Sequence, residues 1–378
     1  MGPADPAWWA QRYRTRGDDV GDRVAAGTPV VGVVGADVPV ELVEAAGAVP
    51  VRLTGDPGPP SAEARHVLGA AVDAPTLTLL TRLLGGSAAG LAGLVVSRDC
   101  QSSLAMFYAL RELRRLDPWR GLPPVHLLDL LHLPRASTTA YDTAEVLRLA
   151  DVLTGWTGRA PLGPDAPAGA LADALRPARA LRERLLLVQQ RRRAAEPTVT
   201  GSLALHVHGV VSTVPAAEAV ELLDALLAAD LPALSAGRRV FLTGSVQDHD
   251  AHYAALEDAG WHVAGEDHDR GDLALTVQVP AEPTAGALAL ARQRRGPASP
   301  TASVPDRAAW TTAEAARCGA HVVLSLVRAH DEAPGWDVPA QRRALAACGV
   351  PLVTLVGQPH RTAPADLLAA LAAPAVAA

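Results

Sequence analysis

Short apolar runs recur along the chain, separated by polar loops and by segments with helical spacing. The runs are rich in valine and leucine and are too continuous for strands with one exposed face, so they predict strands buried on both faces. The predicted strands are residues 30–34, 49–53, 93–97, 125–128, 239–243, 261–264, 321–326 and 351–356. Because helical segments follow most of these runs, the pattern predicts an α/β protein with parallel sheets flanked by helices.

The predicted elements fall into two groups of similar order. Residues 28–160 form the first expected α/β domain and residues 201–378 form the second, joined by a helical linker at 161–200. Residues 1–27 are expected to be a helical segment, with one amphipathic helix over 5–27 packed on the outside of the first domain. The two groups are alike in plan and not detectably alike in sequence.

The first strand opens the most informative stretch, residues 30–53. After this strand, Asp37 stands two residues before a proline, where it can cap a helix, and Glu41 falls early in that helix. Such a unit presents free backbone N–H groups at the carboxyl edge of a parallel sheet, where α/β proteins usually bind ligands. Asp37 and Glu41 are therefore candidate site residues, although capping and first-turn charge explain them equally well.

Composition and charge narrow the function classes. The chain has 378 residues, of which 49% are hydrophobic and 20% charged, and its net charge is −6. This acidic balance, without a basic stripe, argues against a nucleic-acid partner. No apolar run reaches the length of a membrane span and the first residues lack a secretory pattern, so we expect a cytoplasmic protein without a membrane partner.

The three cysteines are too few and too far apart for a disulfide framework or a zinc motif. Cys318 precedes a predicted strand and Cys348 lies at a helix end, and both are expected to be buried, inert thiols. Cys100 begins a helix together with Ser102 and Ser103. It can be a nucleophile activated by the helix dipole or a packing residue, and the serines can hold a carbonyl or phosphate oxygen or cap the helix.

Two histidine pairs suggest a metal: His206 with His208, and His249 with His252. Neither pair comes with carboxylates and further ligands at a recognisable spacing. The Gly-Ser turn after the fifth predicted strand can bind an anion, but it lacks the rest of a P-loop or of a dinucleotide-binding fingerprint. These features alone do not define a function.

Residues 32–55, GVVGADVPVELVEAAGAVPVRLTG, resemble the opening motif of the 2-hydroxyacyl-CoA dehydratase and benzoyl-CoA reductase family. That motif reads roughly Gly-x-x-Cys-x-x-x-Pro-x-Glu, followed by Ala-Ala-Gly-x-x-Pro-x-Arg. Four later segments also resemble the family: GLVVSRDCQSS, RVFLTGSVQDHDAHYAALEDAGWHV, EDHDRGD and GVPLVTL. The resemblance covers most of the chain, whose length is close to that of the family's smaller subunit, the D-component.

The resemblance implies two flavodoxin-like (Rossmann-like) domains that face one another across a cleft for an acyl-CoA substrate. In the family, a related larger subunit pairs with the smaller one, and each holds a [4Fe-4S] cluster through three cysteines. An ATP-dependent activator protein supplies one electron, and the acyl-CoA thioester is dehydrated or reduced through a radical. The resemblance therefore implies a subunit of a lyase that works as a heterodimer.

The candidate site residues follow from this resemblance and from the residues themselves. They are Cys100 and His330 as cofactor and metal ligands, Ser102 and Glu41 for catalysis, and Asp37, Ser103 and Arg52 for substrate binding. The family's first cluster cysteine falls on Gly35, its second on Cys100 and its third at or near His330. Only one of the three positions is thus a cysteine.

Three hypotheses stay open. The chain can be a 2-hydroxyacyl-CoA dehydratase subunit with an iron–sulfur cluster. It can be a degenerate paralogue without a cluster, acting as a structural or ligand-binding partner of a cysteine-complete subunit. It can also be a small-molecule enzyme with new chemistry on the same scaffold.

Overall fold

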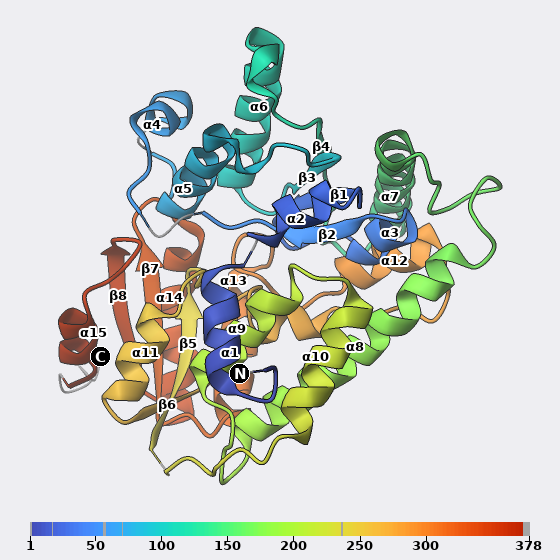
Figure 1. The fold of residues 1–378 in the computed structure, drawn as a ribbon. Helices are drawn as coiled ribbons and strands as arrows, with labels where there is room; N and C mark the ends of the chain where they lie inside the picture. The colour runs from blue at the N-terminus through green and yellow to red at the C-terminus, as the bar shows by residue number, and fades with distance from the viewer. Residues whose placement is uncertain (1, 17, 56–57, 70, 236, 373–378) are drawn as a thin grey trace.

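The computed structural model describes residues 2–16, 18–55, 58–69, 71–235 and 237–372. The chain forms two four-stranded sheets in which all neighbouring strands are parallel (Figure 1). The first sheet has the order β2-β1-β3-β4, and the second repeats it as β6-β5-β7-β8. This order agrees with a flavodoxin-like arrangement and confirms the predicted α/β class.

All eight predicted strands are present, and their observed ends differ from the prediction by at most two residues. The strands are β1 (Val30–Val34), β2 (Val49–Arg52), β3 (Gly93–Ser97), β4 (Val125–Leu128), β5 (Arg238–Gly244), β6 (Trp261–Glu266), β7 (Val322–Arg328) and β8 (Leu352–Gln358). Every residue of β1, β3 and β7 is buried. The continuous apolar runs therefore mark central strands with both faces covered.

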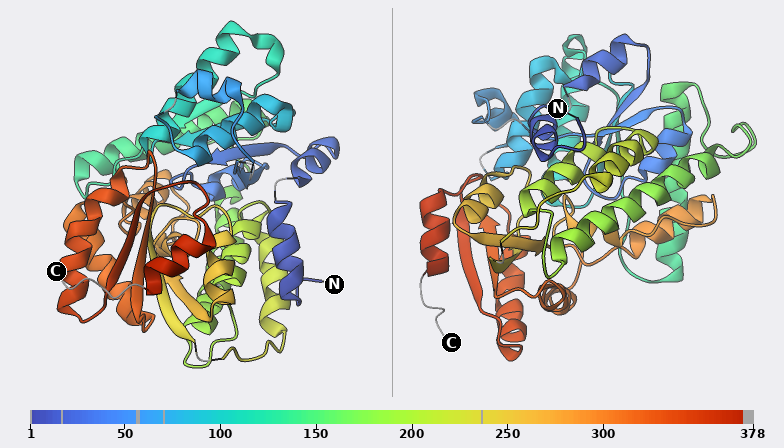
Figure 2. Two further views of the ribbon diagram at one scale, coloured as in Figure 1. Left: turned by 90° about the vertical axis from the view of Figure 1, so that its left-hand side faces the viewer. Right: turned by 60° about the horizontal axis from the view of Figure 1, so that its bottom comes forward.

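Helices cover both sheets (Figures 1 and 2). They are α1 (Pro6–Arg14), α2 (Asp19–Ala25), α3 (Val40–Ala45), α4 (Ala62–Leu68), α5 (Ala74–Arg82), α6 (Gln101–Leu116), α7 (Ala136–Thr157), α8 (Ala170–Arg193), α9 (Gly201–Val211), α10 (Ala216–Ala228), α11 (Ala251–Asp258), α12 (Ala285–Gln293), α13 (Val304–Arg317), α14 (Ala333–Ala347) and α15 (Pro364–Ala372). Within the described residues, none of them is long and apolar enough to cross a membrane.

The N-terminal segment differs from the predicted single helix over 5–27. It forms two helices, because α1 ends at Thr15, whose hydroxyl donates to the Gln11 carbonyl. The prediction that this segment packs on the first sheet is also wrong for α1. Trp9 and Tyr13 belong to the core around β5, where the Tyr13 ring lies against Gly209 of α9. A larger residue than glycine at that contact would displace the ring.

Two elements join the cores of the two sheets. The start of α8 packs in the core around β1, through Leu171 and Leu175, and its later part packs in the core around β5, through Leu185 and Val188. In the opposite direction, α12 leaves the second half of the chain and packs in the β1 core (Figure 1). Each half therefore contributes helices to the core of the other or shares one with it. The predicted domain limits stay a prediction.

Candidate functional site

A cleft of about 700 Å³ lies between the two sheets. One wall comes from residues at or just after the ends of β1, β2 and β3, and the other from residues at or just after the ends of β5, β6 and β7. The carboxyl edges of both sheets thus face a common space. Because ligands of open α/β sheets bind at these edges, the cleft is the candidate site.

The start of α6 forms part of the first wall. Cys100 caps this helix, and its Sγ lies 3.4 Å from the Ser103 backbone nitrogen and 3.1 Å from Ser103 Oγ. Ser103 Oγ in turn lies 3.1 Å from Asp99 Oδ1, to which it can donate. Burial, and then the negative charge of Asp99, raise the pKa of the Cys100 thiol to about 12. The thiol therefore keeps its proton near pH 7, contrary to an activated nucleophile.

Ser102 also lines the cleft, next to Cys100. Its hydroxyl makes no hydrogen bond with another described residue, whereas the Ser103 hydroxyl is engaged by Cys100 and Asp99. Ser102 is thus the serine whose hydroxyl is available to a bound molecule. Ser103 serves to order the start of α6.

Gly35 follows β1 and lines the cleft, at the position that the resemblance assigns to the family's first cluster cysteine. Its φ is +90°, which favours glycine. A Cβ atom here would lie 2.1 Å from Ser97 Oγ and 2.7 Å from Asp99 Oδ2. Asp99 Oδ2 accepts the Ala36 N–H at 2.7 Å, so a carboxylate fills the space that a cysteine side chain would need.

His330 lies on the opposite wall, after β7, with an exposed side chain and a φ of +66°. Among the described residues, neither His330 nor Cys100 lies with two further potential ligand atoms inside a radius that suits one metal site. Iron–sulfur clusters need several cysteine thiolates. One cysteine and one imidazole do not fit a [4Fe-4S] cluster.

The other two cysteines do not change this result. Cys318 is buried in a small core with Phe241 and Val323, as expected. Cys348 is exposed, so its predicted burial is wrong: it caps the end of α14, where the last turn faces solvent. Neither residue lines the cleft.

Several arginines line the cleft, together with carboxylates. Arg52, a predicted substrate-binding residue, lines it, but its guanidinium joins the two halves by donating from Nη1 to the Asp269 carbonyl at 2.7 Å and by pairing with the Asp269 carboxylate. Although burial opposes ionisation, Arg52 holds the pKa of Asp269 well below its usual range. Arg52 is therefore a structural link as well as a lining residue.

Arg270 has a different environment. It lines the cleft and donates from Nη2 to the Leu53 carbonyl at 3.0 Å, yet it forms no ion pair with a carboxylate of the described residues. Burial, and then the neighbouring charge of Arg52, lower the pKa of Arg270 to about 10. The side chain is still cationic at pH 7, so a positive charge without an ion-pair partner among the described residues lies at the cleft, where the charges of Asp269 and Asp248 offset part of it.

Asp37 and Glu41 do not lie in the cleft, contrary to expectation. Asp37 is buried, with Oδ1 3.0 Å from Arg295 Nη1 and Oδ2 3.0 Å from His132 Nε2. Glu41 accepts from Arg292 Nη2 at 2.6 Å and lines a second, smaller cavity of about 250 Å³. Because these arginines belong to α12 and the residues after it, the two carboxylates attach that segment to the first sheet.

Sequence reasoning missed several residues of the cleft. Arg270 is the one basic residue of the acidic segment EDHDRGD apart from its histidine. Arg295 belongs to the arginine-rich stretch at the end of α12 and Arg328 stands alone in the sequence, and both reach the cleft only through the packing of α12 and β7. Their positions after a helix and at a strand end were the available signal.

Fold and cleft define a two-lobed α/β protein with a cleft at the carboxyl edges of both sheets. The chain belongs to the family described as 2-hydroxyglutaryl-CoA dehydratase, D-component, whose model matches residues 36–359. The match runs from the loop after β1 to the residue after β8 and so includes both walls of the cleft. No curated protein matches the chain.

Proposed function

We propose that this chain is a D-component-type dehydratase subunit that binds an acyl-CoA in its cleft and lacks a thiolate-held cluster of its own. The family description names a component of an acyl-CoA dehydratase, which supports an acyl-CoA ligand and a partner subunit. In this proposal, a cysteine-complete larger subunit holds the cluster. An ATP-dependent activator protein would then act on that partner.

The observation that carries the proposal is Arg270, a cation that lines the cleft without an ion pair to a carboxylate of the described residues. Acyl-CoA is a polyanion, and guanidinium groups bind phosphate oxygens through paired, charge-assisted hydrogen bonds. The buried Nε atoms of Arg52, Arg295 and Arg328 also have no hydrogen-bond partner among the described residues. Together these donors favour an anionic ligand beside them, although carboxylates also line the cleft.

The size and lining of the cleft fit the same ligand class. Its volume of about 700 Å³ lies within the usual range of small-molecule sites. Apolar side chains from both walls, including Leu53, Met106 and Leu273, lie beside the arginines. An acyl chain can therefore lie against apolar groups while the phosphates meet the guanidinium groups.

The absence of a cluster in this chain rests on its own residues. Gly35 offers no ligand atom and no room for one, which leaves Cys100 as the one cysteine among the described residues that line the cleft. Ser102 and His330 face the cleft from opposite walls and are the polar groups that we assign to the substrate. We derive no redox step from this chain.

The test is a calorimetric titration of the purified chain with 2-hydroxyglutaryl-CoA, comparing wild type with Arg270→Gln. Loss of one charge-assisted contact costs about 1.5–3 kcal/mol, so we expect affinity to fall roughly tenfold to a hundredfold. Arg343→Gln, an exposed arginine of α14, is the matched control and should bind like wild type. Undetectable binding to wild type, or equal binding by Arg270→Gln, would contradict the proposal.

A further inference from the structure

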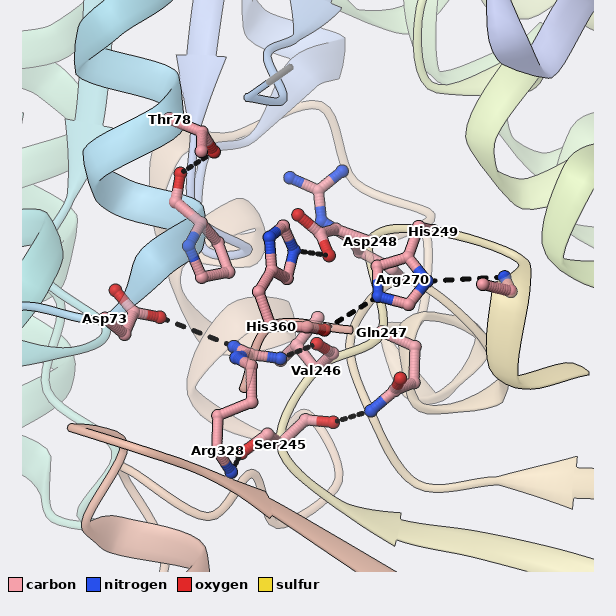
Figure 3. Close-up of polar contacts among 12 residues, drawn as sticks. Asp73, Thr78, Ser245, Val246, Gln247, Asp248, His249, Arg270, Arg328 and His360 are labelled. Carbon is pink, nitrogen blue, oxygen red and sulfur yellow. Dashed lines mark hydrogen bonds and ion pairs between the residues drawn. The ribbon is translucent and has the colours of Figure 1, made fainter. Parts of the chain in front are cut away.

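We propose that Asp248, His249 and His360 form a binding site for a divalent transition-metal ion of the zinc class at the edge of the cleft. One carboxylate oxygen and one nitrogen from each imidazole lie within 4.8 Å of one another. Figure 3 shows the three side chains converging from two segments of the chain. The site is separate from the family's cluster position, since it contains no cysteine.

The fold brings these residues together over a long sequence distance. Asp248 and His249 follow β5, and His360 follows β8, so both loops cross the carboxyl edge of the second sheet. His249 Nε2 donates to the His360 backbone carbonyl at 2.8 Å, which fixes one loop against the other. On the far side, the Tyr13 hydroxyl donates to the Asp248 carbonyl at 3.0 Å.

The ligand atoms need only a small rearrangement to hold an ion. His360 Nε2 lies 2.8 Å from Asp248 Oδ1, and a proton occupies the space between them. With metal–ligand bonds of about 2.0–2.2 Å, tetrahedral ligands stand roughly 3.4 Å apart. The ion would replace that proton as the pair opens by about half an ångström. The third ligand is a ring nitrogen of His249, which must give up its present contact: Nδ1 accepts from the Ala251 N–H at 3.3 Å, and Nε2 donates to the His360 carbonyl at 2.8 Å.

The donor set selects the class of ion. Two imidazoles and one carboxylate suit zinc and neighbouring transition metals, whereas calcium and magnesium prefer oxygen ligands. Three protein ligands leave a coordination position open, as in catalytic zinc sites. Asp248 itself lines the cleft, so that open position is accessible from the space where we place the substrate.

Positive neighbours set a limit on affinity: Arg16 donates to the Asp248 backbone carbonyl, whereas Arg328 is engaged elsewhere. Arg328 donates to the Val246 carbonyl and from Nη2 to Asp73 Oδ2 at 3.4 Å, and its guanidinium points toward these partners in Figure 3. His252 is not a fourth ligand, since both ring nitrogens are hydrogen-bonded, to Gln247 Oε1 and to the Thr362 N–H. Arg270 lines the same cleft and adds to the opposing charge.

The experiment is a calorimetric titration of the chelator-treated full chain with zinc chloride. We expect one ion per chain, with affinity reduced at least tenfold in His360→Gln and in His249→Gln. His66→Ala is the matched control, because His66 is exposed on α4 and far from the cluster in sequence, and it should bind zinc like wild type. Zinc binding that is absent from wild type, or that is as tight in the two cluster variants as in wild type, would overturn the proposal.

A second measurement needs no substitution in the site. Diethylpyrocarbonate modifies accessible imidazole nitrogens, and peptide mass spectrometry locates each modified histidine. Zinc should slow modification of His360 at least tenfold and leave His66 unchanged; equal slowing or no slowing at both would contradict the site. Zinc binding and acyl-CoA binding are measured separately, so failure of either proposal is recognisable without the other.

Discussion

Gly35 shows how a chain can keep the sequence motif of a family without the cysteine that would bind a cluster. The surrounding motif is retained, yet Ser97 and Asp99 occupy the space that a side chain at Gly35 would fill. The positive φ adds a second cost for any other residue. The position is therefore adapted to glycine and is not a simple loss of cysteine.

This adaptation predicts a large destabilisation on adding a single methyl group. Gly35→Ala should lower the free energy of unfolding by about 2–4 kcal/mol, because backbone strain and overpacking add together. Gly86→Ala is the matched control: Gly86 also has a positive φ, of 93°, but has open space at the Cβ position, so it should cost only about 1–2 kcal/mol. Urea unfolding measures both, and equal losses would contradict the steric argument.

Cys100 provides a second prediction at this scale. Because burial and Asp99 raise the pKa of its thiol to about 12, almost no thiolate is present at pH 8. We expect iodoacetamide to modify Cys100 at least tenfold more slowly than the exposed Cys348, as measured by peptide mass spectrometry over time. Modification of Cys100 at the rate of Cys348 or faster would restore the nucleophile hypothesis.

At the scale of elements, buried ion pairs fix helices to strands. Arg192 of α8 and Glu266 of β6 are both fully buried and paired through two hydrogen bonds, one of them 3.0 Å long. Although burial alone would raise it, Arg192 holds the pKa of Glu266 below its usual value of 4.5. Removing one partner leaves the other charge buried and unpaired.

Arg192→Met should therefore lower the free energy of unfolding at pH 7 by about 3–5 kcal/mol. Arg184→Met, on the same helix, breaks an exposed pair with Asp224 and should cost only about 0–1 kcal/mol. Urea unfolding compares the two variants. Similar losses would show that burial of the pair does not govern its contribution.

The Arg192–Glu266 pair also predicts how stability changes with pH. Since the folded pKa of Glu266 lies below the unfolded value, its stabilisation is present above about pH 4.5 and is lost as the pH falls toward the folded pKa. Glu266→Gln should thus be less stable than wild type at pH 7, and the difference should shrink as the pH falls from 4.5. A constant difference would contradict this account.

The strands and most helices could be predicted from the sequence, because each is a local pattern. β1, β3 and β7 are continuous apolar runs, and their burial on both faces makes the pattern clear. The packing of α1 could not be predicted, since the contact that decides it, Tyr13 against Gly209, joins residues far apart in the chain. Local periodicity carries no information on such a contact.

For the whole molecule, the sequence predicted a cleft between facing sheet edges, and the structure has one. Cys100, Ser102, Ser103, Arg52 and His330 line it, whereas Asp37 and Glu41 are buried in ion pairs with arginines that follow or belong to α12. The packing of α12 from the second half against the first sheet could not be predicted from the spacing of residues. The catalytic and substrate-binding roles of the candidate site residues stay predictions.

The central claim is that this family member contains no thiolate-held cluster of its own. Anaerobic purification of the chain alone, followed by iron and acid-labile sulfide analysis and a visible spectrum, tests it most directly. We expect less than about 0.1 iron per chain and no iron–sulfur absorption, because a single cysteine at the cleft cannot hold a cluster. About four iron and four sulfide per chain would contradict the claim.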